Sequence, residues 1–284
     1  MGDENVVIRY LQDRGLLHSQ RTCTCGYVMK LTEKERLRGR RWRCNNRVCR
    51  KQISLRSGTW FEGYKVDFCT AVKFMYSWSH GYTTIRFCCD ELDMSKNTAI
   101  HWNLSMRDVA AEVLMRQPLV IGGTGLTVEV DETVYSKRKY QRGRLYPQQW
   151  VFGGICRETK ECFLVRVPDR SSRTLIPLIQ QYVRPGTTVI TDCWRGYDSL
   201  SQVGYTHQRV NHSANFVNPV TGAHTQTIES LWAELKRGNK LRKGTDRSMV
   251  ESYLCQYMWR RTLRPRENPF ERIVADIATC FPLR

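Results

Sequence analysis

Residues 126–131 read Leu-Thr-Val-Glu-Val-Asp, and this apolar run ending on Asp131 decides the fold. A second apolar run, residues 189–192, also ends on an aspartate, Asp192, and Glu229 lies near the start of an amphipathic stretch. Acids at the ends of buried segments are rare unless something neutralises them. Three such acids brought together would repel one another, and a pair of divalent cations would remove the repulsion and could drive phosphoryl chemistry.

The charge of the chain favours a polyanionic partner. Its 284 residues carry 45 Lys and Arg against 27 Asp and Glu, a net charge of +18, while 41% hydrophobic residues supply a core. Solubility or a basic tail would be simpler explanations, but the cationic clusters recur along the whole chain. We therefore expect an extended path for DNA or RNA.

The N-terminus predicts neither export nor membrane insertion. Its first residues are acidic and lack an apolar core, and no run of 18 apolar residues occurs anywhere. The 12 cysteines are therefore interpreted as reduced thiols with a metal site rather than as disulfides.

Two cysteine pairs predict a zinc ribbon. Cys23 and Cys25 form a C-x-C pair, and Cys44 and Cys49 form a C-x4-C pair after a loop. Two nearby pairs can present four thiolates tetrahedrally to one Zn²⁺, although such pairs more often have two residues between the cysteines. Unliganded thiols are the alternative, and His18 is a weaker substitute ligand.

Cationic residues are dense around the second cysteine pair. Residues 34–51 contain nine Lys and Arg, and Glu35 is the only acid among them. A solvated basic face or a nuclear-import signal would account for this composition, but a metal-stapled hairpin favours phosphate contacts. The candidate DNA contacts here are Arg40, Arg41 and Arg43.

Residues 65–116 are predicted to form three helices. The second runs over residues 85–92 with Thr83 or Thr84 as its N-cap, and the third over about residues 98–115 after a cap at Ser95. Short helix, turn and longer helix is the helix-turn-helix pattern, and a plain helical bundle is the alternative. Residues whose types can contact bases or phosphates are Lys96, Asn97, His101, Asn103 and Arg107.

From residue 119 the pattern changes to strands and helices in the order β-β-β-α-β-α-β-α. This order matches a ribonuclease-H-like sheet, in which the first and fourth strands are neighbours, so Asp131 and Asp192 converge and the last helix brings Glu229 beside them. The loop between the first two strands is strongly basic and adds Lys137, Arg138 and Lys139 as DNA contacts. The expected strands are 128–133, 149–157, 162–167, 188–191 and 206–210, and the helices are 172–183, 225–237, 247–261 and 269–279.

The predicted fold class is thus α/β. A ribonuclease-H-like catalytic domain follows an N-terminal zinc ribbon and a helix-turn-helix domain, and a helical C-terminal tail ends the chain. The predicted divisions are residues 1–62, 63–118, 119–245 and 246–284.

Ordinary roles exist for each acid: a strand-end cap, a turn and a helix first turn. Their joint spacing favours catalysis instead. Glu129 and Glu132 are expected to face mostly away from Asp131. His224 could order the site or be a plain loop residue.

Cationic and aromatic residues near the acids have two interpretations as well. Lys236 lies two helical turns after Glu229, so together with Arg237 it could contact DNA, or it could stabilise the helix C-terminus. Trp194 and Trp232 are expected to be packing residues, although Trp194 beside Asp192 could stack on a displaced base.

The motifs resemble a known family. Residues 130–133 (VDET), 191–197 (TDCWRGY) and 224–232 (HTQTIESLW) resemble a DDE transposase, with the Merlin superfamily and its zinc-ribbon bacterial insertion-sequence relatives as the closest match. The 36 residues between Asp192 and Glu229 fit the Merlin pattern. The resemblance extends from about residue 16 to residue 275 and departs from the family at the C-x-C pair, where C-x2-C is usual.

That resemblance implies cut-and-paste DNA transposition with two Mg²⁺ or Mn²⁺ ions. Asp131 would bridge both ions, Asp192 would hold one and Glu229 the other, so that a water or a 3′-hydroxyl attacks in line. The partners would be double-stranded DNA, as transposon terminal inverted repeats and as target, and a second copy of the chain in a homodimer or higher assembly. The location would be the nucleus in a eukaryotic host, or the cytoplasm and nucleoid in a bacterial one.

Other functions remain open at this point. A domesticated sequence-specific DNA-binding protein without cleavage activity would normally have lost an acid of the triad. A ribonuclease-H-like nuclease without strand transfer would not need the ribbon, the helix-turn-helix or the tail. A zinc-ribbon transcription regulator would leave the three acids unexplained.

Overall fold

The computed structural model of the protein describes residues 3–32, 39–135, 148–211, 217 and 222–284. They form two compact units. The first unit comprises Met1–Val113 with Arg264–Arg284, and the second comprises Leu114–Leu263. The four divisions expected from the sequence remain a prediction.

A helix and a small antiparallel sheet begin the first unit. β1 pairs with β2 and β2 with β3, and the register places Met29 opposite Cys44 and Arg43 opposite Gln52. Cys44 is therefore the last residue of β2, directly before the turn that leads to Cys49. The elements are α1 (Glu4–Asp13), β1 (Met29–Thr32), β2 (Arg41–Cys44) and β3 (Gln52–Ser54).

The predicted helices of the first unit are present, and their caps explain where they start. Thr84 Oγ1 accepts from the N–H of Phe87 at 3.1 Å, and Ser95 Oγ accepts from the N–H of Thr98 at 3.2 Å. A C-terminal helix packs on α2 in the same unit. The elements are α2 (Phe68–Ser79), α3 (Ile85–Leu92), α4 (Lys96–Arg116) and α8 (Pro269–Cys280).

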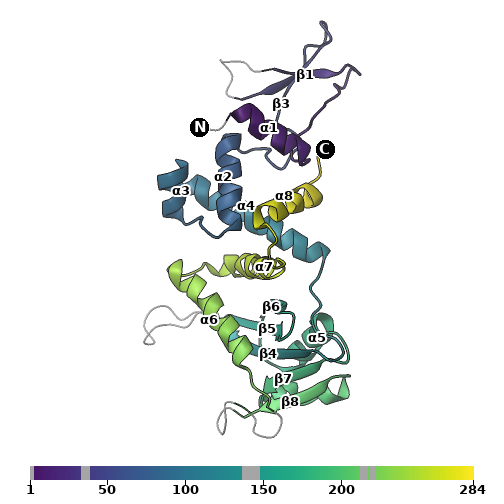
Figure 1. The fold of residues 1–284 in the computed structure, drawn as a ribbon, viewed down its shortest axis with the longest axis vertical. Helices are drawn as coiled ribbons and strands as arrows, with labels where there is room; N and C mark the ends of the chain where they lie inside the picture. Colours follow the sequence, from purple (N-terminus) through teal and green to yellow (C-terminus); the bar gives the residue numbers. More distant parts are fainter. Residues whose placement is uncertain (1–2, 33–38, 136–147, 212–216, 218–221) are drawn as a thin grey trace. The chain divides into compact units, whose positions relative to one another are not determined.

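The second unit contains a five-stranded mixed sheet in the order β6-β5-β4-β7-β8 (Figure 1). β4, β5 and β6 pair antiparallel, whereas β4 pairs with β7 and β7 with β8 in parallel. The expectation that the first and fourth strands of this region are neighbours is therefore confirmed. The elements are β4 (Thr127–Val134), β5 (Trp150–Cys156), β6 (Cys162–Val167), α5 (Ser172–Tyr182), β7 (Thr188–Asp192), η2 (Arg195–Tyr197), η3 (Leu200–Gln202), β8 (Thr206–Val210), α6 (Gln226–Leu241), η4 (Arg247–Met249) and α7 (Val250–Arg261).

Helices cover both faces of this sheet. On one face, Val130 and Phe152 pack against Leu175 of α5 in a buried cluster. On the other, Val151 packs in a second cluster with residues of α6 and α7. Alternation along the strands accounts for the division, because successive side chains point to opposite faces.

A glycine in β5 lets α6 approach the sheet closely. Gly153 lies opposite Asp131, and a Cβ atom there would be 2.8 Å from Cη2 of Trp232 and 2.7 Å from Cδ2 of Leu164. Any other residue would push the Trp232 ring away from the sheet. The glycine thereby helps to set the height of α6 above β4.

No helix in the part of the chain that the structure describes combines the length and apolarity needed to cross a membrane.

Candidate functional site

Two of the predicted acids come together through the register of the parallel strands. β4 and β7 pair with Val128 beside Val189 and Glu129 beside Ile190. If this register is continued by two residues, Asp131 comes level with Asp192 at the carboxyl end of β7, and the two carboxylates are close enough that the charge of Asp192 raises the pKa of Asp131. The Asp192 carboxylate accepts from the backbone N–H of Trp194 at 2.9 Å, so the turn after β7 holds its orientation.

The third acid is carried by α6, whose face toward β4 is fixed by two side-chain contacts. Trp232 Nε1 donates to Asp131 Oδ2 at 2.9 Å, and Lys236 Nζ donates to Thr133 Oγ1. Glu229 is one turn before Trp232 and accepts from Thr225 Oγ1 at 3.2 Å. Residues three or four apart share a helix face, so Glu229 lies on the side of α6 that meets Asp131.

Glu129 anchors the start of α6. It is fully buried, forms an ion pair with Arg157, and accepts from the N–H of Ile228 at 2.9 Å. The prediction that Glu129 faces away from Asp131 is wrong, because residues two apart on a strand share a face and both carboxylates meet α6. Its role is structural: it satisfies one free N–H at the helix N-terminus, where a negative charge is favoured.

His224 belongs to the same anchor. Its backbone oxygen accepts from Arg157, and its Nδ1 lies 3.7 Å from Glu129 Oε1. Of the two roles considered for this histidine, the structure supports ordering of the helix start that carries Glu229.

The carboxylates influence one another electrostatically. Burial raises the pKa of Asp131 to about 6, and the charges of Asp192 and Glu229 add to the rise. Burial likewise raises the pKa of Glu132 to about 7, with further contributions from Asp131 and Asp192. Glu132 lies on the opposite side of β4 from α6, as expected, but its charge is felt at the site.

These residues fit divalent cations. A partly buried carboxylate whose charged form is disfavoured by two neighbouring acids is stabilised when a cation neutralises it. Carboxylate oxygens are the donors that Mg²⁺ and Mn²⁺ prefer. Among the described residues, Cys23, Cys25, Cys44 and Cys49 make a separate group of possible metal donors whose atoms all lie within 4.8 Å of one another.

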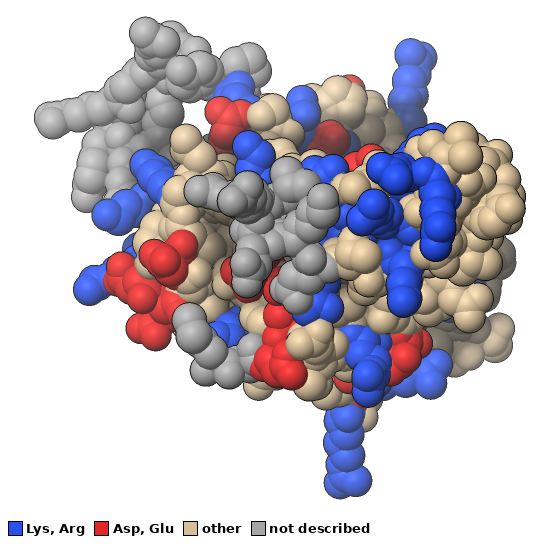
Figure 2. All heavy atoms as spheres, turned by 90° about the horizontal axis from the view of Figure 1, so that it is seen from above, with Lys and Arg blue, Asp and Glu red and all other residues tan. Residues whose placement is uncertain are grey.

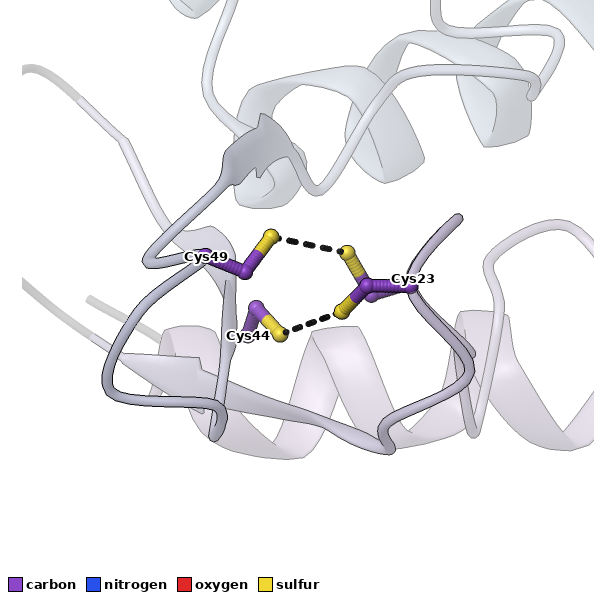
Figure 3. Close-up of side chains that lie close together, drawn as sticks. Cys23, Cys44 and Cys49 are labelled. Atoms are coloured by element: carbon purple, nitrogen blue, oxygen red, sulfur yellow. Dashed lines mark hydrogen bonds between the residues drawn. The ribbon is translucent and has the colours of Figure 1, made fainter.

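Those four cysteines form a second candidate site. Figure 3 shows the thiols of Cys23, Cys44 and Cys49 pointing toward one another. The sulfurs of Cys23 and Cys49 lie 3.7 Å apart, and those of Cys25 and Cys44 lie 3.4 Å apart. Four thiolates at about 2.3 Å from a tetrahedral Zn²⁺ have their sulfurs about 3.8 Å apart. The cluster can therefore hold zinc, and the short C-x-C pair does not prevent all four sulfurs from meeting. His18 is not part of the group.

Without a metal, the thiols of this cluster differ in pKa, so they do not lose their protons at the same pH. The backbone N–H of Cys25 lowers the pKa of the Cys23 thiol to about 6, whereas burial raises the pKa of Cys44 to about 12. A zinc ion would favour all four as thiolates.

Most of the predicted DNA contacts that can be placed lie at the surface. Figure 2 shows Lys and Arg in several groups on one face, with Asp and Glu in smaller groups. Exposed or partly exposed members are Arg40, Arg41, Arg43, Lys96, Asn97, His101, Lys236 and Arg237. The predicted contacts Lys137, Arg138 and Lys139 lie outside the described residues.

Two residues of α4 do not fit the prediction. Arg107 is only 3% exposed, so the prediction that it contacts DNA is wrong: its side chain is buried. Asn103 donates to the backbone oxygen of Ala99 and accepts from Thr83, so its amide holds α4 against the preceding turn.

No pattern in the sequence predicts that Arg170 contacts two tryptophan rings near the acids. The guanidinium of Arg170 lies 4.4 Å from the ring centroids of both Trp150 and Trp194. The three residues come from separate segments, and only the folded sheet brings them together.

Comparisons with known proteins place the chain in a family. Residues 122–262 match the ISXO2-like transposase domain. An uncharacterized transposase-like protein of Haemophilus influenzae is 35% identical over an alignment of 101 residues, and the match covers 34% of this chain and 78% of that protein. The chain belongs to the family of transposases with an ISXO2-like domain, and the matched region contains all three acids.

Proposed function

We propose that this chain is a DDE transposase that binds transposon terminal inverted repeats, cuts their strands and joins the freed ends to target DNA. Asp131, Asp192 and Glu229 would hold two Mg²⁺ or Mn²⁺ ions. The observation that carries the proposal is the parallel pairing of β4 with β7, whose register, continued by two residues, brings Asp131 level with Asp192. Family membership supports it.

The proposed fold of the second unit is ribonuclease-H-like. Three antiparallel strands followed by two parallel ones, with the first and fourth adjacent, support this assignment. In the first unit, the proposed roles are a structural zinc at the cysteine cluster and a helix-turn-helix formed by α2, α3 and α4. Assignment to the Merlin superfamily, assembly as a dimer on paired DNA ends and location with the host DNA are parts of the same proposal.

Each side chain of the site has a task in this chemistry. Bound divalent ions would supply charge neutralisation and activation of a water or a 3′-hydroxyl. Trp232 orients the Asp131 carboxylate through its indole N–H, and Thr225 orients Glu229. The ion pair of Glu129 with Arg157 fixes the helix that brings the third acid. Such prior orientation lowers the cost of reaching the reactive geometry.

A cleavage and joining assay tests the proposal. Labelled duplexes with candidate inverted ends would be incubated with Mg²⁺ or Mn²⁺ and wild type, Asp192→Asn or Asp198→Asn. Asp198 is a matched control, because it is an exposed acid near β7 that pairs with Arg209. We expect metal-dependent nicking and joining by wild type and Asp198→Asn, and a loss of at least about 100-fold in Asp192→Asn.

Two results would change the conclusion. Cutting by Asp192→Asn at the wild-type rate would remove the acid triad from the mechanism. Tight binding of ends by wild type without any cutting would favour the alternative function, a domesticated DNA-binding protein.

A further inference from the structure

An exposed tryptophan lies at the edge of the acidic site. Trp194 is two residues after Asp192, and its backbone N–H holds that carboxylate at 2.9 Å. Its side chain remains 40% exposed. The position of a large aromatic ring at the surface beside functional acids requires an explanation, because large apolar surface is favourably buried.

The ring is held firmly in place. Trp194 Nε1 donates to the backbone oxygen of Arg170 at 3.0 Å, and the guanidinium of Arg170 lies 4.4 Å from the ring centroid. The same guanidinium lies 4.4 Å from the ring centroid of Trp150 on β5. Cation–π contacts on two indoles and the hydrogen bond fix the Trp194 side chain against the sheet.

A glycine makes this arrangement possible. A Cβ atom at Gly196 would be 2.8 Å from both Cδ1 and Nε1 of Trp194, and 3.0 Å from the oxygen of Arg170. Since real Cβ atoms do not approach so closely, only glycine allows the ring to lie where it does. The platform formed by Trp194 and Arg170 is therefore a feature of the local fold rather than a chance surface rotamer.

The chemistry of this platform selects its ligand. A flat indole with a guanidinium against it attracts a flat, electron-rich ring and an adjoining anion, and a nucleotide offers both. A base inside a duplex already stacks on its neighbours, so only an unpaired base can present a face to Trp194. A base stacked here would belong to a nucleotide close to the phosphate at the acids, because Asp192 is two residues away.

We propose that Trp194, braced by Arg170, is a stacking platform for one unpaired nucleobase of the DNA strand held at the acids. This inference rests on the proposed function, since it assumes that DNA reaches the acidic site. Stacking contacts tolerate any base, so the platform would recognise local opening of the duplex rather than sequence.

A binding experiment with paired and locally unpaired duplexes tests the platform. The cleavage position would first be mapped with active protein. Affinities would then be measured with the full chain carrying Glu229→Gln, so that DNA is not consumed. Matched duplexes would be fully paired or would carry one unpaired nucleotide at successive positions around the cleavage position. The variants compared in this background are Trp194→Ala and Trp194→Phe.

We expect Glu229→Gln alone to bind one of the unpaired duplexes about 10-fold more tightly than the paired one. Adding Trp194→Ala should abolish that preference while leaving the affinity for the paired duplex within about 2-fold, and Trp194→Phe should keep part of it. Cooperative thermal unfolding of Trp194→Ala, with a midpoint close to that of the parent, would show that the variant is folded.

The outcomes separate the two proposals. Binding of both duplexes without preference, or an equal preference in Trp194→Ala, would overturn the stacking platform and leave the proposed function intact. Failure of the parent protein to bind either duplex would overturn the proposed function, and the platform with it.

Discussion

Replacing Asp131 by asparagine should stabilise the metal-free protein while destroying its activity. The side chain keeps an oxygen for the indole N–H of Trp232 but can no longer carry a charge. In the wild type, burial and two neighbouring acids raise the pKa of Asp131 from 3.8 to about 6. Each pKa unit corresponds to about 1.4 kcal/mol, so the charged form costs the folded state about 3 kcal/mol at most.

The pH dependence follows from the direction of the shift. Because the folded protein holds the proton more tightly than the unfolded chain, this aspartate favours folding below pH 3.8, and the benefit disappears as pH rises through about 6. Asparagine is uncharged at every pH, so the variant keeps this stabilisation when the pH rises. Asp131→Asn should therefore unfold about 6–12 °C higher than wild type at pH 8, and at nearly the same temperature at pH 3.

Thermal unfolding without and with Mg²⁺ or Mn²⁺ measures both effects. The metal should raise the unfolding midpoint of the wild type at pH 8 and raise it less at pH 5. It should hardly change the unfolding midpoint of Asp131→Asn. Asp198→Asn is the control: without metal it should unfold close to the wild-type temperature at both pH values, and the metal should raise its midpoint as much as that of the wild type. An equal stabilisation by Asp131→Asn at pH 3 and pH 8 would refute the electrostatic argument, since a pH-independent gain cannot come from a titrating acid.

Three further predictions concern other parts of the molecule. Glu129→Ala removes the acceptor for the N–H of Ile228 and the ion-pair partner of Arg157, so the free energy of unfolding, measured by urea denaturation, should fall by about 3–5 kcal/mol. For the control Asp90→Ala, which breaks an exposed ion pair, it should fall by less than about 1 kcal/mol. Cys25→Ser should lower the metal content from one zinc per chain, measured by atomic emission, and full zinc retention would contradict a four-cysteine site. Arg43→Ala should reduce the slope of log affinity against log salt concentration by about 1, whereas the buried Arg107→Ala should lower stability and leave the slope unchanged.

The sequence predicted the sheet well because local signals agreed with one another there. The strands at residues 162–167 and 206–210 and the helix at residues 85–92 have the expected ends. Apolar runs mark most of the strands, and Thr84 caps the helix. Asp131 and Asp192 were found because each ends an apolar run, and Glu229 because it opens an amphipathic stretch. Strand order then brings the two aspartates together.

Two predictions, for Glu129 and Arg107, were wrong about the direction in which the side chain points, although the spacing of residues in the sequence indicated the correct direction. Glu129 is two residues before Asp131, so simple alternation places both on one face. Arg107 lies eight residues after the buried Ala99 on α4 and three before the buried Ala110, which is the spacing of the inward face of a helix. Residue type suggested DNA contact in that case, and position within the helix was the better guide.

The contact of Arg170 with two tryptophans could not have been predicted. Nothing distinguishes a single arginine in a loop of a chain with 45 basic residues. Trp150, Arg170 and Trp194 meet only because β5 and β7 both flank β4, and the turn after β7 folds back at Gly196. Contacts of this kind depend on tertiary structure and leave no local pattern.

The first unit is built from both ends of the chain, with consequences for limited proteolysis. Arg264–Arg284 belongs with Met1–Val113, where the N–H of Arg284 donates to the oxygen of Gly58 at 2.9 Å and Tyr10 stacks on Phe270. The second unit is thus an insertion, joined to the first by two covalent connections. A protease that cuts one connection should leave a nicked molecule whose fragments stay associated under native conditions, and only a second cut would release the unit that carries the acids.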